Sequence, residues 1–159
     1  ANGQERERGA ADAFAASGRA QTTAVVNTLT EAGQAQEDTA ALLTAHPEIN
    51  VLLALNEPTS VGAAQAVEEL GLSEEVFFVG FDSNVLTVDG LQDGSVDALV
   101  VQNPYAMGYL GVESAYQLLT GQGGSLAETV DTSTQVVDRS NLFTLDSQKA
   151  LFSFEEHLD

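Results

Sequence analysis

Short apolar runs, separated by longer helix-like stretches, constrain the fold of this chain more than any other feature. Each run has the length of a buried strand and stops at a polar or turn residue. The spacing between them leaves room for a helix in most intervals. The five runs are Thr22–Val26, Val51–Leu55, Val76–Phe81, Ala98–Val101 and Ser133–Val137.

The stretches between the runs have helical composition and recognisable ends. Pro47 ends one helix, Gly71 closes the next in a left-handed cap, and Pro104 opens another. Alternating strands and helices form a parallel sheet with helices on both faces. We therefore predict a three-layer α/β/α sandwich with a mostly parallel, flavodoxin-like sheet. It spans residues 1–152, and residues 153–159 form a loose tail. The expected helices are Glu5–Ser17, Ala35–Thr44, Thr59–Leu70, Val85–Gln92 and Pro104–Leu119.

Compact polar residues follow three of the predicted strands. Asn56, Asp82 and Gln102 come directly after the second, third and fourth runs. In open α/β sheets, ligands bind outside the carboxyl ends of the strands, so these side chains should line one crevice. Two amides and a carboxylate both donate to and accept from hydroxyl groups. That set suits a neutral polyhydroxy ligand better than a nucleotide or a metal.

Helix capping is an alternative role for two of these residues. Asn and Asp are favoured N-caps, so Asn56 and Asp82 would serve equally well as caps of the helices that follow. Gln102 differs, because Asn103 and Pro104 already supply a cap and a first helical position. A purely structural role therefore explains Gln102 less well.

The charge of the chain excludes some partners. Its 159 residues carry 24 acidic and 5 basic side chains, for a net charge of −19. Such a surface repels nucleic acid and anionic membranes. The single lysine, Lys149, fits a high-salt habitat and fits an ordinary acidic protein equally well. No apolar run approaches the roughly 20 residues of a membrane span.

Metal, cofactor and enzyme signatures are weak. Cysteine is absent, and His46 and His157 are far apart in sequence, so no metal site is predicted. There is no P-loop and no G-x-S-x-G elbow, and no cofactor is expected. A phosphoreceiver would need a lysine after a late strand, whereas Lys149 lies near the C-terminus. We predict a binding protein rather than an enzyme.

Four motifs in order resemble a known family. They are Leu42–Ile49, Ala54–Glu57, Val79–Asp82 and Gln102–Gly108, preceded by an opening helix at Asn2–Gly9. Together they look like the second lobe of the ribose-binding-protein type of periplasmic sugar receptors, a superfamily shared with lac-repressor-like regulators. The resemblance covers the chain from Asn2 to about Phe152.

The resemblance implies four ligand-binding residues. An arginine of the first helix falls on Arg6, with Arg8 as a second candidate. The other three fall on Asn56, Asp82 and Gln102. The family usually has an aromatic residue after the first strand of this lobe, and Thr30 holds that place here. This departure weakens any inference to ribose in particular.

The resemblance also implies a function and partners. A two-lobed receptor would close on a sugar and deliver it to a membrane ABC-transporter permease or a chemoreceptor. The N-terminal lobe would be the missing partner. The expected location is periplasmic or extracellular, with a lipid anchor as one option. The alternative is the effector-binding core of a lac-repressor-like transcription regulator without its DNA-binding domain.

Overall fold

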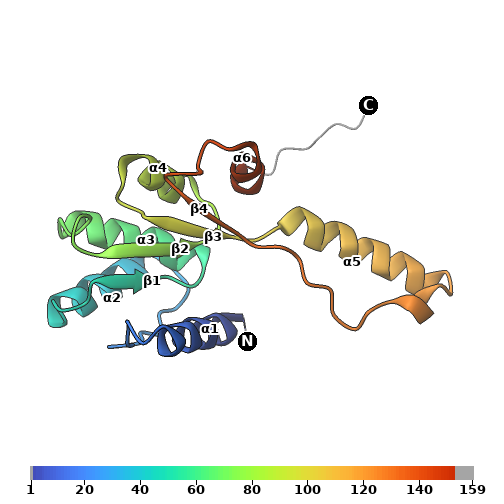
Figure 1. The fold of residues 1–159 in the computed structure, drawn as a ribbon, viewed down its shortest axis with the longest axis horizontal. Helices are drawn as coiled ribbons and strands as arrows, with labels where there is room; N and C mark the ends of the chain where they lie inside the picture. Colours follow the sequence, from blue (N-terminus) through green and yellow to red (C-terminus); the bar gives the residue numbers. More distant parts are fainter. Residues whose placement is uncertain (1, 153–159) are drawn as a thin grey trace.

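The computed structural model describes residues 2–152 and shows one mixed sheet. The sheet has four strands in the order β1-β2-β3-β4 (Figure 1). β1, β2 and β3 are parallel, and β4 pairs antiparallel with β3. The mostly parallel sheet is therefore confirmed. The strands are β1 (Val51–Leu53), β2 (Phe77–Phe81), β3 (Ala98–Val101) and β4 (Gln135–Asp138).

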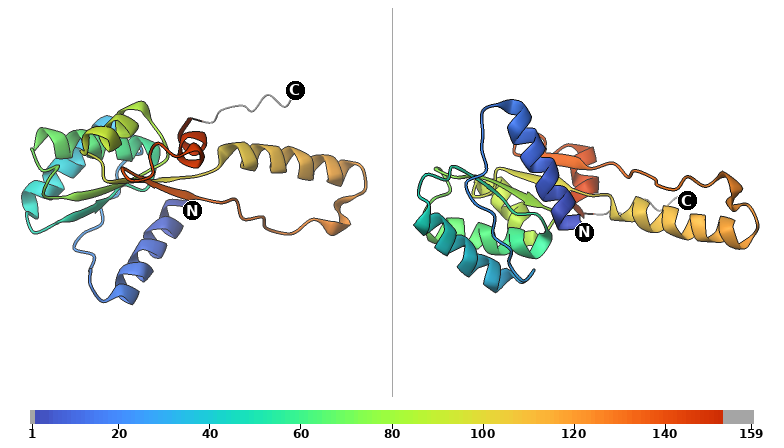
Figure 2. Two further views of the ribbon diagram at one scale, coloured as in Figure 1. Left: turned by 45° about the horizontal axis from the view of Figure 1, so that its top comes forward. Right: turned by 90° about the horizontal axis from the view of Figure 1, so that it is seen from below.

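Helices lie on both faces of this sheet. The first face carries α2, α3, α4 and α6, and α1 lies across the opposite face (Figure 2). α5 extends away from the sheet, and the chain returns through the short helix η1 (Figure 1). The helices are α1 (Asn2–Ser17), α2 (Ala32–Ala45), α3 (Glu57–Glu69), α4 (Val85–Asp93), α5 (Pro104–Leu119), η1 (Gly123–Ser125) and α6 (Leu145–Phe152).

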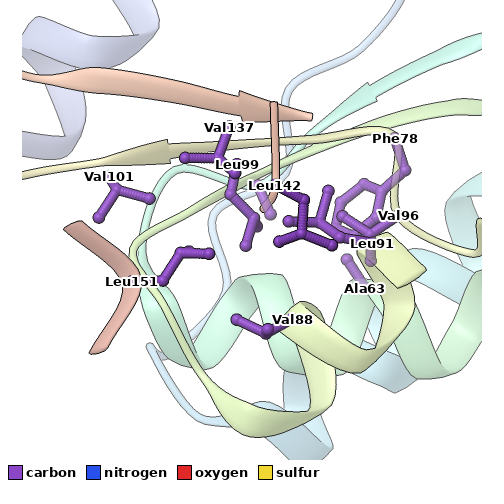
Figure 3. Packing of buried hydrophobic residues seen from close by; sticks show 11 residues of the cluster. Ala63, Phe78, Val88, Leu91, Val96, Leu99, Val101, Val137, Leu142 and Leu151 are labelled. Carbon is purple, nitrogen blue, oxygen red and sulfur yellow. The ribbon is translucent and has the colours of Figure 1, made fainter. Parts of the chain in front are cut away.

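The hydrophobic core lies between the sheet and its more heavily covered face. Phe78, Leu91 and Leu99 are completely buried there, and Val137 joins them from β4 (Figure 3). Side chains alternate along a strand, so Phe78 and Gly80 face this core while Phe77 and Phe81 face the α1 side. The core thus fixes the register of β2 and the direction in which Phe81 points.

The predicted first strand is wrong for the structure as it stands. Residues 20–29 form no strand, and Val25 and Val26 are about half exposed. A strand forms only against a partner edge, and a cavity separates this segment from β1. The expected tail at 153–159, with His157, lies outside the described residues. No helix within residues 2–152 is both long and apolar enough to cross a bilayer.

Candidate functional site

Asp82 lies at the carboxyl end of β2 with an unusual backbone conformation. Its φ is 62°, in the left-handed region that few residues other than glycine adopt. Its backbone N–H donates to the Val100 carbonyl of β3 at 2.9 Å, which holds this conformation in place. Asp82 does not cap α4. That cap is Asn84, whose side chain forms a capping box with Thr87.

Gln102 lies beside Asp82 at the end of the neighbouring strand. Its Nε2 donates to Oδ1 of Asp82 at 2.6 Å, and both side chains are half-buried. The cap of α5 is Asn103, as the sequence predicted, and it accepts from the Ala106 N–H at 2.9 Å. Gln102 and Asp82 therefore point to one another and not into a helix end.

Arg6 reaches the same edge of the sheet from α1. Its Nη1 donates to the Leu55 carbonyl at 2.7 Å, at the end of β1. Its guanidinium carbon lies 4.6 Å from the centre of the Phe81 ring, within range of a cation–π interaction. One hydrogen bond and one aromatic face thus hold the arginine, and its remaining N–H groups are available to a ligand.

Asn56 performs the capping role that the sequence left open. Its Oδ1 accepts from the Thr59 N–H at 3.1 Å and caps α3. The Nδ2 group makes no hydrogen bond within the described residues. Capping and ligand binding are therefore compatible for Asn56, because each would use a different atom of the amide.

The two secondary candidates lie apart from this cluster. Arg8 is exposed and pairs with Glu5 on α1. Two residues along a helix is about 200° of rotation, so Arg8 faces away from Arg6. Thr30 is exposed at the bend before α2 and has a φ of 59°. No hydrogen bond among residues 2–152 joins Thr30 to the other candidates.

Sequence reasoning missed two supporting contacts. Phe81 is the ring beneath Arg6, and strand alternation from Gly80 would have placed it on that face. Asn84 Nδ2 donates to Glu57 Oε1 at 2.6 Å, which ties the start of α4 to the start of α3. No sequence signal indicates that second pair, since 27 residues separate its members.

We define the crevice cluster as Arg6, Asn56, Asp82 and Gln102. It places a cation, two amides and a carboxylate at the carboxyl ends of β1, β2 and β3. Such groups match the alternating donors and acceptors of a polyhydroxy compound. No group of three His, Asp or Glu side chains among the described residues is arranged to hold a metal ion.

Comparisons with known proteins agree on one family. The family model described as "Periplasmic binding protein domain" matches residues 1–123. The ribose import binding protein of Escherichia coli is 37% identical over 81 residues, which cover 51% of this chain and 27% of that protein. The D-ribose/D-allose-binding protein of Pseudomonas aeruginosa is 34% identical over 121 residues, covering 76% of this chain and 38% of that one.

Solved structures extend the similarity to nearly all of the fold. An Agrobacterium vitis ABC-transporter solute-binding protein, bound with α-D-tagatopyranose, matches with a TM-score of 0.88 at 27% identity. The match covers 94% of this chain and 49% of that one. A glucose-galactose binding protein of Geobacillus stearothermophilus gives 0.83 at 29% identity, covering 87% and 49%.

The chain spans about half the length of these solved relatives, and less of the curated ones. These relatives are binding proteins, and the names of the Escherichia coli and Agrobacterium vitis proteins place them in import or ABC-transporter systems. They give no support to the transcription-regulator alternative. From the family match and the shared fold, this chain belongs to the periplasmic binding protein family.

Proposed function

We propose that this chain is the sugar-binding second lobe of an ABC-transporter solute-binding protein. The observation that carries the proposal is the crevice cluster, in which contacts between different elements hold three of the four side chains, those of Arg6, Asp82 and Gln102. Three of the relatives are named for ribose, allose, glucose or galactose, and the fourth was solved with a bound tagatose; all of these are monosaccharides. A permease or a chemoreceptor would receive the closed form, in a periplasmic or extracellular location.

Each side chain has a chemical role in this proposal. Asp82 keeps Oδ2 to accept from sugar hydroxyls, because Oδ1 is occupied by Gln102. Arg6 donates from its remaining N–H groups to ring or hydroxyl oxygens. Asn56 donates through Nδ2, and the carbonyl oxygen of Gln102 accepts. Every group would act on neutral hydroxyls, so no proton transfer is required.

The mechanism needs a second lobe, and α5 supports its existence. None of the α5 residues is buried. One stripe of the helix is nevertheless apolar, and its exposed fractions reach 74% at Val112 and 88% at Leu119. A stripe at this spacing normally packs against another element. Its members are Tyr105, Tyr109, Val112, Tyr116 and Leu119. We infer that the other lobe covers this stripe, so that α5 is part of the interface between the lobes. Closure of the two lobes would then occur about this interface.

Calorimetric titration of the full-length protein tests the proposal. D-ribose, D-allose, D-tagatose and D-galactose are the probes, and at least one should bind with micromolar affinity or better. The 159-residue chain alone offers half the contacts, so its affinity should be millimolar or weaker (about −4 kcal/mol). If the full-length protein binds none of these sugars, or the lone chain binds one at micromolar affinity, the proposal fails.

A further inference from the structure

One buried hydroxyl joins the start of α3 to the end of β2. Ser60 is completely buried in the first turn of α3, and its Oγ accepts from the Phe81 N–H at 2.8 Å. The same hydroxyl donates to the Asn56 carbonyl at 2.8 Å, and the Phe81 carbonyl is a second acceptor at 3.2 Å. A hydroxyl has one donor and two acceptor sites. Ser60 therefore holds the backbone of Asn56 and the backbone of Phe81 at the same time.

The Phe81 N–H depends on this oxygen because β1 stops short of it. β1 ends at Leu53, whose register partner on β2 is Val79. Phe81 thus lies beyond the end of β1, while on its other side it pairs with Val100 of β3. A backbone N–H that is removed from water without a partner costs free energy. The Ser60 hydroxyl therefore completes the hydrogen bonding of β2 at the point where β1 has ended.

Gly80 leaves the space that this contact requires. A β-carbon at Gly80 would lie 3.1 Å from the Oγ of Ser60 and 2.9 Å from the Cδ2 of Leu99. Both distances are shorter than an ordinary contact between these atoms, so a larger residue at this position would separate α3 from β2. The sequence thus combines a small residue on the strand with a hydroxyl on the helix.

Serine is not the residue that the local structure of α3 favours. Ala63 and Val67 are its buried neighbours on the same helix. Alanine at position 60 would be the better helix former and would bring no polar group into the core. A residue that breaks a local preference in this way is expected at a functional position.

Both contacts of Ser60 lead to the crevice cluster. Phe81 supplies the ring that lies 4.6 Å from the Arg6 guanidinium carbon, and Asp82 is the next residue in the chain. Asn56 belongs to the cluster itself. We propose that Ser60 is a positioning residue of the ligand site, which fixes Asn56 directly and fixes Arg6 and Asp82 through Phe81. Because it is completely buried, Ser60 acts without touching the ligand. This inference rests on the proposed function.

Ser60→Ala in the full-length protein removes the hydroxyl, and Asp97→Ala is the matched control. The Oδ2 of Asp97 accepts from the Phe78 N–H at 2.7 Å, so the control removes a side-chain acceptor from the opposite end of the same strand. Both variants should have a lower melting temperature than the unsubstituted protein. Calorimetric titration uses D-ribose, D-allose, D-tagatose and D-galactose as probes. Only Ser60→Ala should also lose affinity, by roughly three- to ten-fold, for the probes that bind the unsubstituted protein.

The position of Arg6 provides a second measurement that needs no sugar. Protons held over the face of an aromatic ring have resonances shifted upfield by the ring current. The δ-protons of Arg6 should show this shift in the unsubstituted full-length protein and in Asp97→Ala, and should lose much of it in Ser60→Ala. Ser60→Cys is a further variant for use if Ser60→Ala does not fold. A thiol is a weaker donor and acceptor than a hydroxyl, so both changes should appear at smaller size.

A purely structural hydroxyl would lower the melting temperature alone. The proposal is therefore overturned if the Ser60 variant keeps the sugar affinity of Asp97→Ala, or if its Arg6 resonances match those of the unsubstituted protein. If none of the four sugars binds the unsubstituted full-length protein, the proposed function fails. The Arg6 resonances then decide by themselves whether Ser60 positions the crevice cluster.

Discussion

Asp82 combines a strained backbone with a side chain that makes no structural cap. Left-handed conformations cost an ordinary residue about 1–2 kcal/mol, and strain of this kind gathers at functional positions. The contacts with Val100 and Gln102 hold Asp82 in place from the next strand. The carboxylate is therefore held in a fixed orientation at the carboxyl end of β2.

Replacing Asp82 should weaken sugar binding and leave folding nearly unchanged. Asp82→Asn retains the shape and the tolerance of a left-handed backbone but removes the charge. Hydrogen bonds to charged groups contribute roughly 1.5–3 kcal/mol, so affinity in the full-length protein should fall ten-fold or more. The melting temperature should hardly move, because Asn84 caps α4. Gln102→Ala should behave similarly. Wild-type affinity in both variants would show that the crevice cluster does not bind the sugar.

Asn56 permits its two roles to be separated. Asn56→Asp keeps the oxygen that caps α3 and removes the Nδ2 donor, so affinity should fall while stability holds. Asn56→Ala removes both groups and should also cost about 1 kcal/mol of unfolding free energy. Calorimetric titration and thermal melting on the two variants provide the comparison. Equal stability losses in both would contradict the cap geometry.

At the scale of elements, α2 and α3 pack together through a glycine. A β-carbon at Gly62 of α3 would lie 2.2 Å from the Ala32 carbonyl oxygen and 2.7 Å from the Gln36 nitrogen, both backbone atoms of α2. This close approach sets the distance between the two helices.

Gly62→Ala should therefore destabilise the protein, although alanine is the better helix former. Overpacking of this kind costs typically 1–3 kcal/mol. Gly33→Ala is the matched control in α2, since nothing lies within 4 Å of its added carbon. The unfolding free energy of the Gly33→Ala control should rise by up to about 1 kcal/mol, because alanine has the higher helix propensity. Urea denaturation measures the stability of both variants. Equal unfolding midpoints for the two would contradict the packing described for α2 and α3.

α5 is the element whose environment differs most between this chain and the proposed two-lobe protein. Val112→Asp places a charge on the apolar stripe. Surface substitutions change stability by about 0.5 kcal/mol or less, so the lone chain should tolerate it. If the other lobe covers the stripe, Val112→Asp should lower the unfolding free energy of the full-length protein by several times that amount of about 0.5 kcal/mol. Gln117→Asp, off the stripe, is the control. Denaturation experiments measure both variants in the lone chain and in the full-length protein. An equal effect of Val112→Asp on the two proteins would argue against the α5 interface.

At the scale of the whole molecule, the net negative charge is the feature that most affects stability. A net charge of −19 opposes compaction through self-repulsion. The Arg8–Glu5 ion pair and the hydrogen-bonded His46–Glu48 pair are both exposed, so they offset little of this repulsion. Screening by dissolved salt is therefore the main way to reduce this repulsion.

If the acidity is a high-salt adaptation, the melting temperature should rise steeply between low and molar NaCl. Scanning calorimetry in NaCl and KCl checks this, with sucrose as an uncharged control. A similar rise in both salts is expected, because screening does not distinguish the cations. A flat profile would remove the halophile hypothesis and leave the sugar-binding proposal untouched.

Local signals in the sequence were enough to predict much of the fold. The sequence predicted the bounds of α5 correctly, with Asn103-Pro104 at its start and Gly121 just after its end. It also predicted the strand Ala98–Val101 to the residue. The rule that ligands bind at the carboxyl ends of strands also predicted that Asp82 and Gln102 lie together, and their side chains are hydrogen-bonded. These predictions succeeded because short-range chemistry and the direction of parallel strands determine them.

Tertiary structure alone decided the remaining features. Only the folded sheet shows that β4 runs antiparallel and that Asn84, not Asp82, caps α4. The segment Thr22–Val26 has the composition of a strand, yet it pairs with nothing among the described residues. Strand propensity belongs to a segment, but strand formation requires a neighbouring edge. That edge comes from residues far away in the chain, so local composition carries no information about it.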